Sequence, residues 1–163
     1  MPSFDIVNQV DHQTLDNAIN SAKREILNRF DFRDSKSVID LDKKKLTIHI
    51  VTENELRIKA ISDAIISRMV KNGLDPKCLD FGKEEYASGD MVKKDIQVKE
   101  GIEKEIAKKV VKLVKDLNLK VQSSIMDDQV RVTGKKIDEL QTVIGFLKKQ
   151  NVGIPLQFIN MKS

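Results

Sequence analysis

The stretch LKVQSSIMDDQVRVT, residues 119–133, decides the fold class of this 163-residue chain. Apolar residues alternate with polar ones on both sides of Asp127-Asp128, as in two half-buried strands. The acidic pair supplies a two-residue turn, so residues 119–126 and 129–133 should form a β-hairpin. Its apolar face, which should pack on helices, comprises Val121, Ile125, Val130 and Val132. Its polar face comprises Lys120, Gln122, Ser124, Gln129, Arg131 and Thr133.

Helices flank this hairpin on both sides. Residues 101–118 and 135–149 place their apolar side chains at intervals of three and four, which predicts two amphipathic helices. Residues 91–99 and 156–159 have the composition of strands. The second half of the chain therefore has the order βαββαβ.

The first half repeats this order at an offset of about 90 residues. We expect strands at 3–10, 37–41, 45–51 and around 78–81, with one helix from Asp11 to about Phe30 and another from Thr52 to Gly73. Phe30 would complete the apolar face of the first helix, and core packing is the favoured role for Phe32. Thr52 and Glu55 have capping-box spacing, and Leu56 would begin the apolar face of the second helix.

A βαββαβ unit is the ferredoxin-like arrangement, in which two helices cover one face of a four-stranded antiparallel sheet. The sequence therefore predicts an α+β protein with two such domains. Because aromatic residues make up only 4 % of the chain and tryptophan is absent, the cores must be aliphatic.

Four segments together resemble the bacterial YajQ family: MPSFDIV (1–7), RFDFR (29–33), LKVQ (119–122) and VRVTGK (130–135). The resemblance covers essentially the whole chain. It implies two ferredoxin-like domains that exchange their N-terminal strands, so that one domain spans 11–99 and the other spans 1–10 plus 100–163. It also implies a protein without catalytic activity that binds nucleotides, with RNA or nucleotides bound in some members and cyclic di-GMP in others.

Charge is unevenly distributed along the chain. Residues 99–163 contain 13 Lys and Arg against 8 Asp and Glu, a net charge of +5, whereas residues 1–98 contain 16 against 17, a net charge of −1. A basic half favours an anionic partner, although solvated lysine-rich helices give the same count.

Several classes of protein are excluded or disfavoured. Cys78 is the single cysteine, so no internal disulfide or thiolate cluster can form. His12 and His49 are too far apart in sequence to suggest a zinc motif. There is no signal peptide and no apolar stretch of about 20 residues, so we expect a cytoplasmic protein with no membrane partner. No sequence motif calls for a cofactor.

Known catalytic templates also fail. The segment 134–136 lacks the upstream glycine and the following Ser or Thr of a phosphate-binding P-loop. The acid pairs Asp127-Asp128 and Glu84-Glu85 are better interpreted as turn and loop residues than as catalytic carboxylates. An enzyme is therefore the least favoured reading.

The candidate binding surface is the polar face of the 119–133 hairpin, whose alternative interpretation is a plain solvated sheet face. A second candidate is the start of the helix at 135, where backbone N–H groups attract anions and Gly134 would allow close approach. The strands at 45–51 and 129–133 lack the stacking aromatics of RNA-recognition domains. Stacking would have to come from Phe32, Tyr86 or an arginine plane; alternatively, phosphate contacts hold the nucleic acid. We predict these contacts at Arg33, Lys120, Arg131, Lys135 and Lys136.

Two functions follow from these features. The favoured one is binding of a nucleotide or RNA. The alternative is a protein-interaction adaptor without a nucleotide ligand, working through an apolar patch or a sheet edge.

Overall fold

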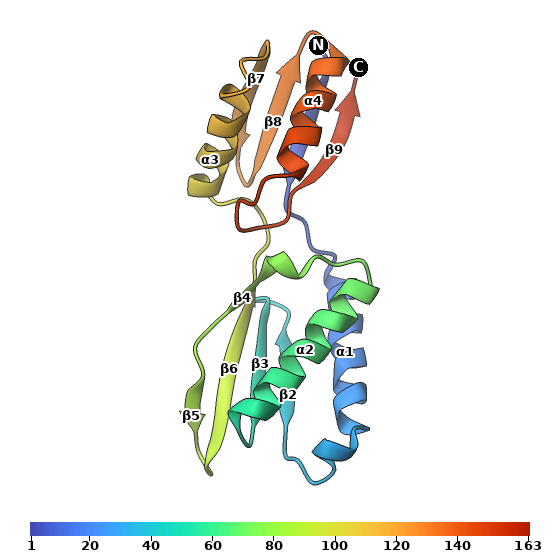
Figure 1. The fold of residues 1–163 in the computed structure, drawn as a ribbon, viewed down its shortest axis with the longest axis vertical. Coiled ribbons are helices and arrows are strands. Elements are labelled where there is room, and N and C mark those ends of the chain that lie inside the picture. The colour runs from blue at the N-terminus through green and yellow to red at the C-terminus, as the bar shows by residue number, and fades with distance from the viewer. The chain divides into compact units, whose positions relative to one another are not determined.

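The computed structural model describes all 163 residues, which divide into two compact units. One unit comprises Val10–Lys99, and the other comprises Met1–Gln9 together with Glu100–Ser163. Each unit has an antiparallel sheet, two α-helices and a buried aliphatic core of its own (Figure 1). The expectation of an α+β protein is confirmed.

The Val10–Lys99 unit contains the sheet β2-β3-β6-β4, with β5 also paired to β6. Helices α1 and α2 pack on one face of this sheet (Figure 1), where Ile48, Ile50 and Ile96 are fully buried. The elements are α1 (His12–Leu27), η1 (Phe30–Phe32), β2 (Val38–Asp42), β3 (Thr47–Thr52), α2 (Glu55–Lys71), η2 (Pro76–Cys78), β4 (Leu79–Phe81), β5 (Glu85–Ala87) and β6 (Met91–Val98).

The other unit contains the sheet β7-β8-β1-β9. Its core joins Phe4 and Val132 of the sheet to Val110 and Leu140 of the helices, and Phe4 meets Phe158 edge to face at 6.1 Å between ring centroids. The elements are β1 (Ser3–Val7), α3 (Lys104–Lys115), β7 (Val121–Met126), β8 (Gln129–Gly134), α4 (Ile137–Lys148) and β9 (Gln157–Lys162).

Interior strands of both sheets come from distant parts of the chain. β1 lies between β8 and β9, more than 120 residues away in sequence. β6, the last strand of the Val10–Lys99 unit, lies between β4, which precedes it closely, and β3, which is much earlier in the sequence. Neither sheet is complete until the C-terminal end of its unit has been made.

The first helix ends earlier than its apolar pattern predicts. Helix α1 stops at Leu27, and Arg29 has extended backbone angles, so the chain turns into η1. Phe30 is therefore 84 % exposed, and its predicted place on the helix face is wrong. Phe32 is buried in the core, as predicted.

The second helix begins at a different cap. Asn54, not Thr52, is the N-cap, because its side chain accepts a hydrogen bond from the Arg57 N–H. The Thr52 hydroxyl instead contacts Ser37 Oγ at 2.8 Å. The predicted apolar face is confirmed at Ile61, Ala64, Ile65 and Met69, but its first turn is wrong, because Leu56 is exposed and Ile58 is buried instead.

Other differences are smaller. The first strand ends at Val7 instead of residue 10, strand β5 was not predicted, and the last two helices are shorter than expected at both ends. In α3 the fully buried positions are Ala107, Val110 and Val114. Ile125, expected to point inward, is 41 % exposed because it lies near the end of an edge strand.

Candidate functional site

Arg131, the central residue of the predicted polar face, is bound to a carboxylate of the same sheet. Its Nε donates to Asp5 Oδ1 at 2.8 Å, and Asn160 donates to Asp5 Oδ2 at 3.0 Å. The hydrogen bond from Arg131 lowers the pKa of Asp5 against the opposing effect of burial. A phosphate would have to compete with Asp5 for this guanidinium.

Lys120, Lys135 and Lys136 are all exposed and gather at one end of the β7–β8 hairpin. Val121 pairs with Gly134, so the backbones of Lys120 and Lys135 continue the two strands side by side. Lys136 occupies the N-cap position of α4 without a side-chain capping bond. The structure thus brings these three predicted residues together, and Arg131 is not a member of their cluster.

Gly134 has a packing role at this end of the hairpin. A Cβ on this residue would lie 3.0 Å from Val121 Cγ1 and 3.3 Å from Leu140 Cδ2. The absence of a side chain therefore lets β7 and α4 close over β8, and Gly134 itself is buried. The expectation that Gly134 admits an anion is wrong, because its free side is filled by protein.

Arg33 belongs to the other unit, directly after η1. It is exposed, and its guanidinium carbon lies 6.0 Å from the centre of the exposed Phe30 ring. This pair forms an exposed cation–π contact.

The unit Val10–Lys99 has a cavity of about 530 Å³ between the η1 turn and the first turns of α2. Its volume falls in the range of small-molecule sites. We call it the Arg57 pocket; its lining is Arg29, Asp31, Phe32, Asn54, Leu56, Arg57, Lys59, Ala60 and Asp63. Sequence reasoning missed most of these residues. Arg29 and Asp31 lie within the RFDFR segment, but nothing in the sequence linked that segment to residues 54–63.

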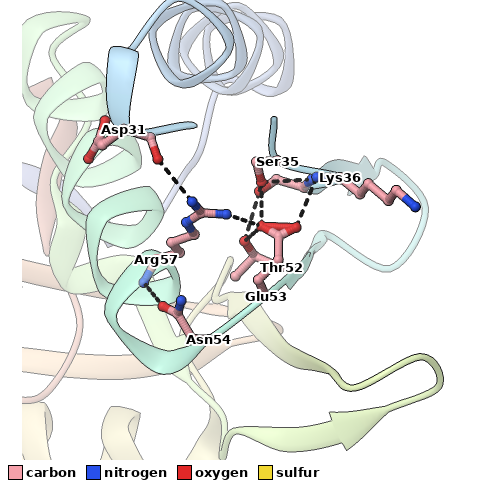
Figure 2. Close-up of polar contacts among 8 residues, drawn as sticks. Asp31, Ser35, Lys36, Thr52, Glu53, Asn54 and Arg57 are labelled. Atoms are coloured by element: carbon pink, nitrogen blue, oxygen red, sulfur yellow. Dashed lines mark hydrogen bonds and ion pairs between the residues drawn. The ribbon is translucent and has the colours of Figure 1, made fainter. Parts of the chain in front are cut away.

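Arg57 holds the walls of this pocket together (Figure 2). Its Nη1 donates to Glu53 Oε1 at 2.7 Å, and its Nη2 donates to the Asp31 carbonyl at 3.1 Å. One guanidinium therefore ties the turn after α1 to the junction between β3 and α2.

Glu53 is the second centre of this network. Its carboxylate accepts hydrogen bonds from the Ser35 hydroxyl and from the Lys36 N–H at 2.9 Å, in addition to Arg57 (Figure 2). Partial burial acts to raise the pKa of Glu53, but the hydrogen bonds, that of Ser35 foremost, outweigh it and lower the pKa to about 2. The carboxylate is therefore charged at neutral pH, so Arg57 and Ser35 keep a charged acceptor.

The Phe32 ring contacts both arginines of the Arg57 pocket. The guanidinium carbons of Arg29 and Arg57 lie 5.6 Å and 5.4 Å from the centre of its ring. Arg29 also forms a two-pronged ion pair with Asp31, at 3.0 Å and 2.9 Å. Both guanidiniums are thus fixed in orientation, which is the arrangement that favours recognition of planar or phosphate-bearing ligands.

The pocket has charges of both signs. Arg29, Arg57 and Lys59 are cationic, while Asp31 and Asp63 are anionic. Lys59 and Asp63 lie four residues apart on α2, exposed and without an ion pair in the structure. Elsewhere, no group of three or more His, Cys, Asp or Glu side chains is placed to hold a metal ion. No helix combines the length and apolar character needed to cross a membrane.

Comparison with known proteins places the chain in a family. Residues 2–162 match the family model described as "Nucleotide-binding protein YajQ-like". A relative from Cytophaga hutchinsonii named "Nucleotide-binding protein" is 59 % identical over 162 residues, covering 99 % of this chain and all of the relative. Relatives of the same name from Nitratidesulfovibrio vulgaris, 49 % identical with both chains fully covered, and Oleidesulfovibrio alaskensis, 50 % identical with the same coverage, also match. The chain therefore belongs to the YajQ family.

Proposed function

We propose that this protein binds a nucleotide in the Arg57 pocket and performs no catalysis on it. The observation that carries the proposal is a cavity of about 530 Å³ whose lining includes the oriented guanidiniums of Arg29 and Arg57 together with Lys59. The names of the family relatives, which refer to nucleotide binding and to no enzyme, support the same function.

The chemistry of the lining suits a nucleotide with a phosphodiester. Lys59 and the outer edge of Arg29 supply charge for phosphate oxygens, and arginine planes also stack on bases. Asp63 can accept hydrogen bonds from a ribose hydroxyl or from the N–H edge of guanine. Cyclic di-GMP and single-stranded RNA both carry these groups, and they are the ligands that we propose to test.

We also propose the domain architecture that the sequence and the family resemblance predict. Each unit would be a ferredoxin-like domain, with 11–99 as one domain and 1–10 plus 100–163 as the other, and the two would exchange their first strands. The pairing of β1 with β8 and β9, and of β6 with β3 and β4, supports this arrangement.

The binding test is calorimetric titration of cyclic di-GMP, GMP and an RNA oligonucleotide at low and high salt. Lys59→Glu should weaken binding about tenfold or more, since a hydrogen bond to a charged group is worth about 1.5–3 kcal/mol. Lys71→Glu, exposed at the far end of the same helix, is the matched control and should leave affinity unchanged.

A double variant, Lys120→Glu with Lys135→Glu, distinguishes the Arg57 pocket from the lysine cluster of the other unit. Loss of binding in this variant, with Lys59→Glu unaffected, would move the site to the β7–β8 hairpin. No binding of any of the three ligands at low salt would overturn the nucleotide function itself.

A further inference from the structure

Strand β7 is an open edge of its sheet. In the order β7-β8-β1-β9 it pairs with β8 on one side and with no strand on the other. Alternate residues of such a strand direct their N–H and C=O groups away from the sheet, where another extended chain can pair with them. Six consecutive residues, Val121–Met126, form this edge.

A groove runs along the same edge, between β7 and helix α3, which lie side by side in Figure 1. Its volume is about 610 Å³. The floor is apolar, with Val114 buried and the other members half-buried. The apolar members are Val111, Val114, Leu119 and Val121. The groove therefore offers a place for apolar side chains directly beside unpaired backbone groups.

The helix side of the groove carries positive charge, because Lys115 of α3 is the only charged residue of its lining. Lys104, Lys108 and Lys115 follow one another on the stripe of α3 that contains Val111, at intervals of three and four residues. All three are exposed, and none forms an ion pair in the structure. The ligand that complements this rim is negatively charged.

The corresponding groove of the other unit, between α1 and edge strand β2, differs in this respect. Its volume is only about 250 Å³. Lys23 and Asp40 line it and form an ion pair across it at 3.8 Å. Its charge is thus neutralised internally, whereas the lysines beside β7 are not.

We propose that the β7–α3 groove binds an extended, acidic segment of another protein, which adds to the sheet as a strand next to β7. Backbone hydrogen bonds along the edge would provide affinity, alternate apolar side chains would enter the groove, and acidic side chains would meet the lysines. A second copy of this chain is a poor occupant, because pairing two β7 edges would bring two lysine rims together. This function is separate from nucleotide binding, which is proposed for the other unit.

The edge contribution is tested with Ser123→Pro. In a hairpin with a two-residue turn the residue pair next to the turn, here Met126 and Gln129, is hydrogen-bonded, and hydrogen-bonded and non-hydrogen-bonded pairs alternate from there. Ser123 and Val132 are therefore a non-hydrogen-bonded pair, so the Ser123 N–H points to the open edge. Proline is tolerated at such positions of edge strands but removes the donor. Ser123→Ala keeps the donor and is the matched control.

The probe is an eight-residue peptide of alternating glutamate and valine, added to the ¹⁵N-labelled full-length protein. We expect shifts of the β7 amide signals, retained in Ser123→Ala and weakened about tenfold in affinity in Ser123→Pro. The undisturbed amide spectrum of Ser123→Pro outside β7 verifies its fold. Equal affinity of the two variants would overturn strand addition.

Charge selection is tested with Lys108→Glu/Lys115→Glu, which does not touch the strand. This variant should bind the glutamate peptide about fivefold more weakly and should prefer a lysine–valine peptide instead. Lys148→Glu on α4 is the control and should behave as the unmodified protein. Three results would each overturn the proposal. The β7 amides could stay unshifted at about 1 mM glutamate peptide, or they could be shifted by an RNA oligonucleotide instead. Ultracentrifugation could also show a dimer that Ser123→Pro dissociates.

Discussion

Asp5 and Arg131 lie directly opposite each other on neighbouring strands β1 and β8, with Arg131 Nε 2.8 Å from Asp5 Oδ1. The Asp5 side chain is only 3 % exposed, whereas that of Arg131 is 42 % exposed. Because the carboxylate is buried and the guanidinium is half-exposed, the main role of Arg131 is to neutralise the buried charge of Asp5. The pair fixes the first strand of the chain in a sheet built mainly from the last third.

Replacing Arg131 by methionine should therefore lower the stability of the sheet, with Tm reduced by roughly 5 °C or more. The Tm of Arg131→Lys should lie between those of Arg131→Met and the unmodified protein, because a single amine keeps the charge but cannot reproduce the forked contact. The pKa of Asp5 is lowered by Arg131, so the stabilisation exists above the ordinary value of 3.8 and is lost as the pH falls below it. The difference between Arg131→Met and the unmodified protein should shrink in urea unfolding at pH 3.

Gln129→Met, on the same strand and face, provides the control for a change of β8 surface. Equal stability of Arg131→Met and this control at pH 7 would contradict the assignment.

Glu53→Gln should destabilise the Val10–Lys99 unit by about 2 kcal/mol at pH 7, because Arg57 and Ser35 lose a charged acceptor. The pKa of Glu53 is about 2 in the fold against an ordinary 4.5, so its contribution is complete above 4.5 and disappears as the pH approaches 2. Denaturant unfolding across this range should show a flatter acid limb in the variant. An unchanged pH profile, or an equal effect from Glu84→Gln in the exposed loop, would disprove the network's role.

The two glycines of the β8–α4 region should respond to alanine in opposite directions. Gly134→Ala places a methyl group 3.0 Å from Val121 and should cost about 1–3 kcal/mol. Gly145→Ala, within α4 and with open space around it, should stabilise by about 0.5–1 kcal/mol. Thermal unfolding of both variants measures the contrast, and stabilisation by Gly134→Ala would show that the hairpin end is loosely packed.

Cys78 should be unreactive in the folded protein. Burial, with a further contribution from Asp75, raises the pKa of its thiol to about 11, and only the thiolate reacts with disulfide reagents. Ellman's reagent at pH 8 should modify Cys78 slowly in buffer and within seconds to minutes in concentrated urea. Fast modification in buffer would mean that the η2–β4 segment opens readily.

The hairpin at 121–134 could be predicted closely because its information is local. Alternation of apolar residues set its strands, and Asp127-Asp128 set its turn. The end of α1 could not be predicted, because Phe30 continues the apolar spacing although the backbone already turns at Arg29. The second helix was predicted to begin two residues too early, because the polar run from Thr52 to Asn54 contains two residues that can cap a helix.

The candidate site was harder to predict than the fold, because its contacts are long-range. The alternation of the hairpin placed Arg131 on the polar face as a phosphate contact, but its partner Asp5 is 126 residues away and becomes a neighbour only through the register of β1 and β8. The Arg57 pocket likewise joins residues 29–32 to residues 54–63. By contrast, Lys120, Lys135 and Lys136 come together through the hairpin itself, which the sequence does specify.

The placement of β1 has a consequence for biosynthesis. β1 is made before all the other strands, yet its partners β8 and β9 are made last, which at about 5–20 residues per second is a delay of roughly 8–30 s. Once Lys99 has been made, the Val10–Lys99 unit has all its strands and can fold, while the apolar strand β1 still lacks its partners. A gene fragment that encodes only residues 100–163 would lack an interior strand, so supplying residues 1–9 as a separate peptide should be needed to restore that sheet.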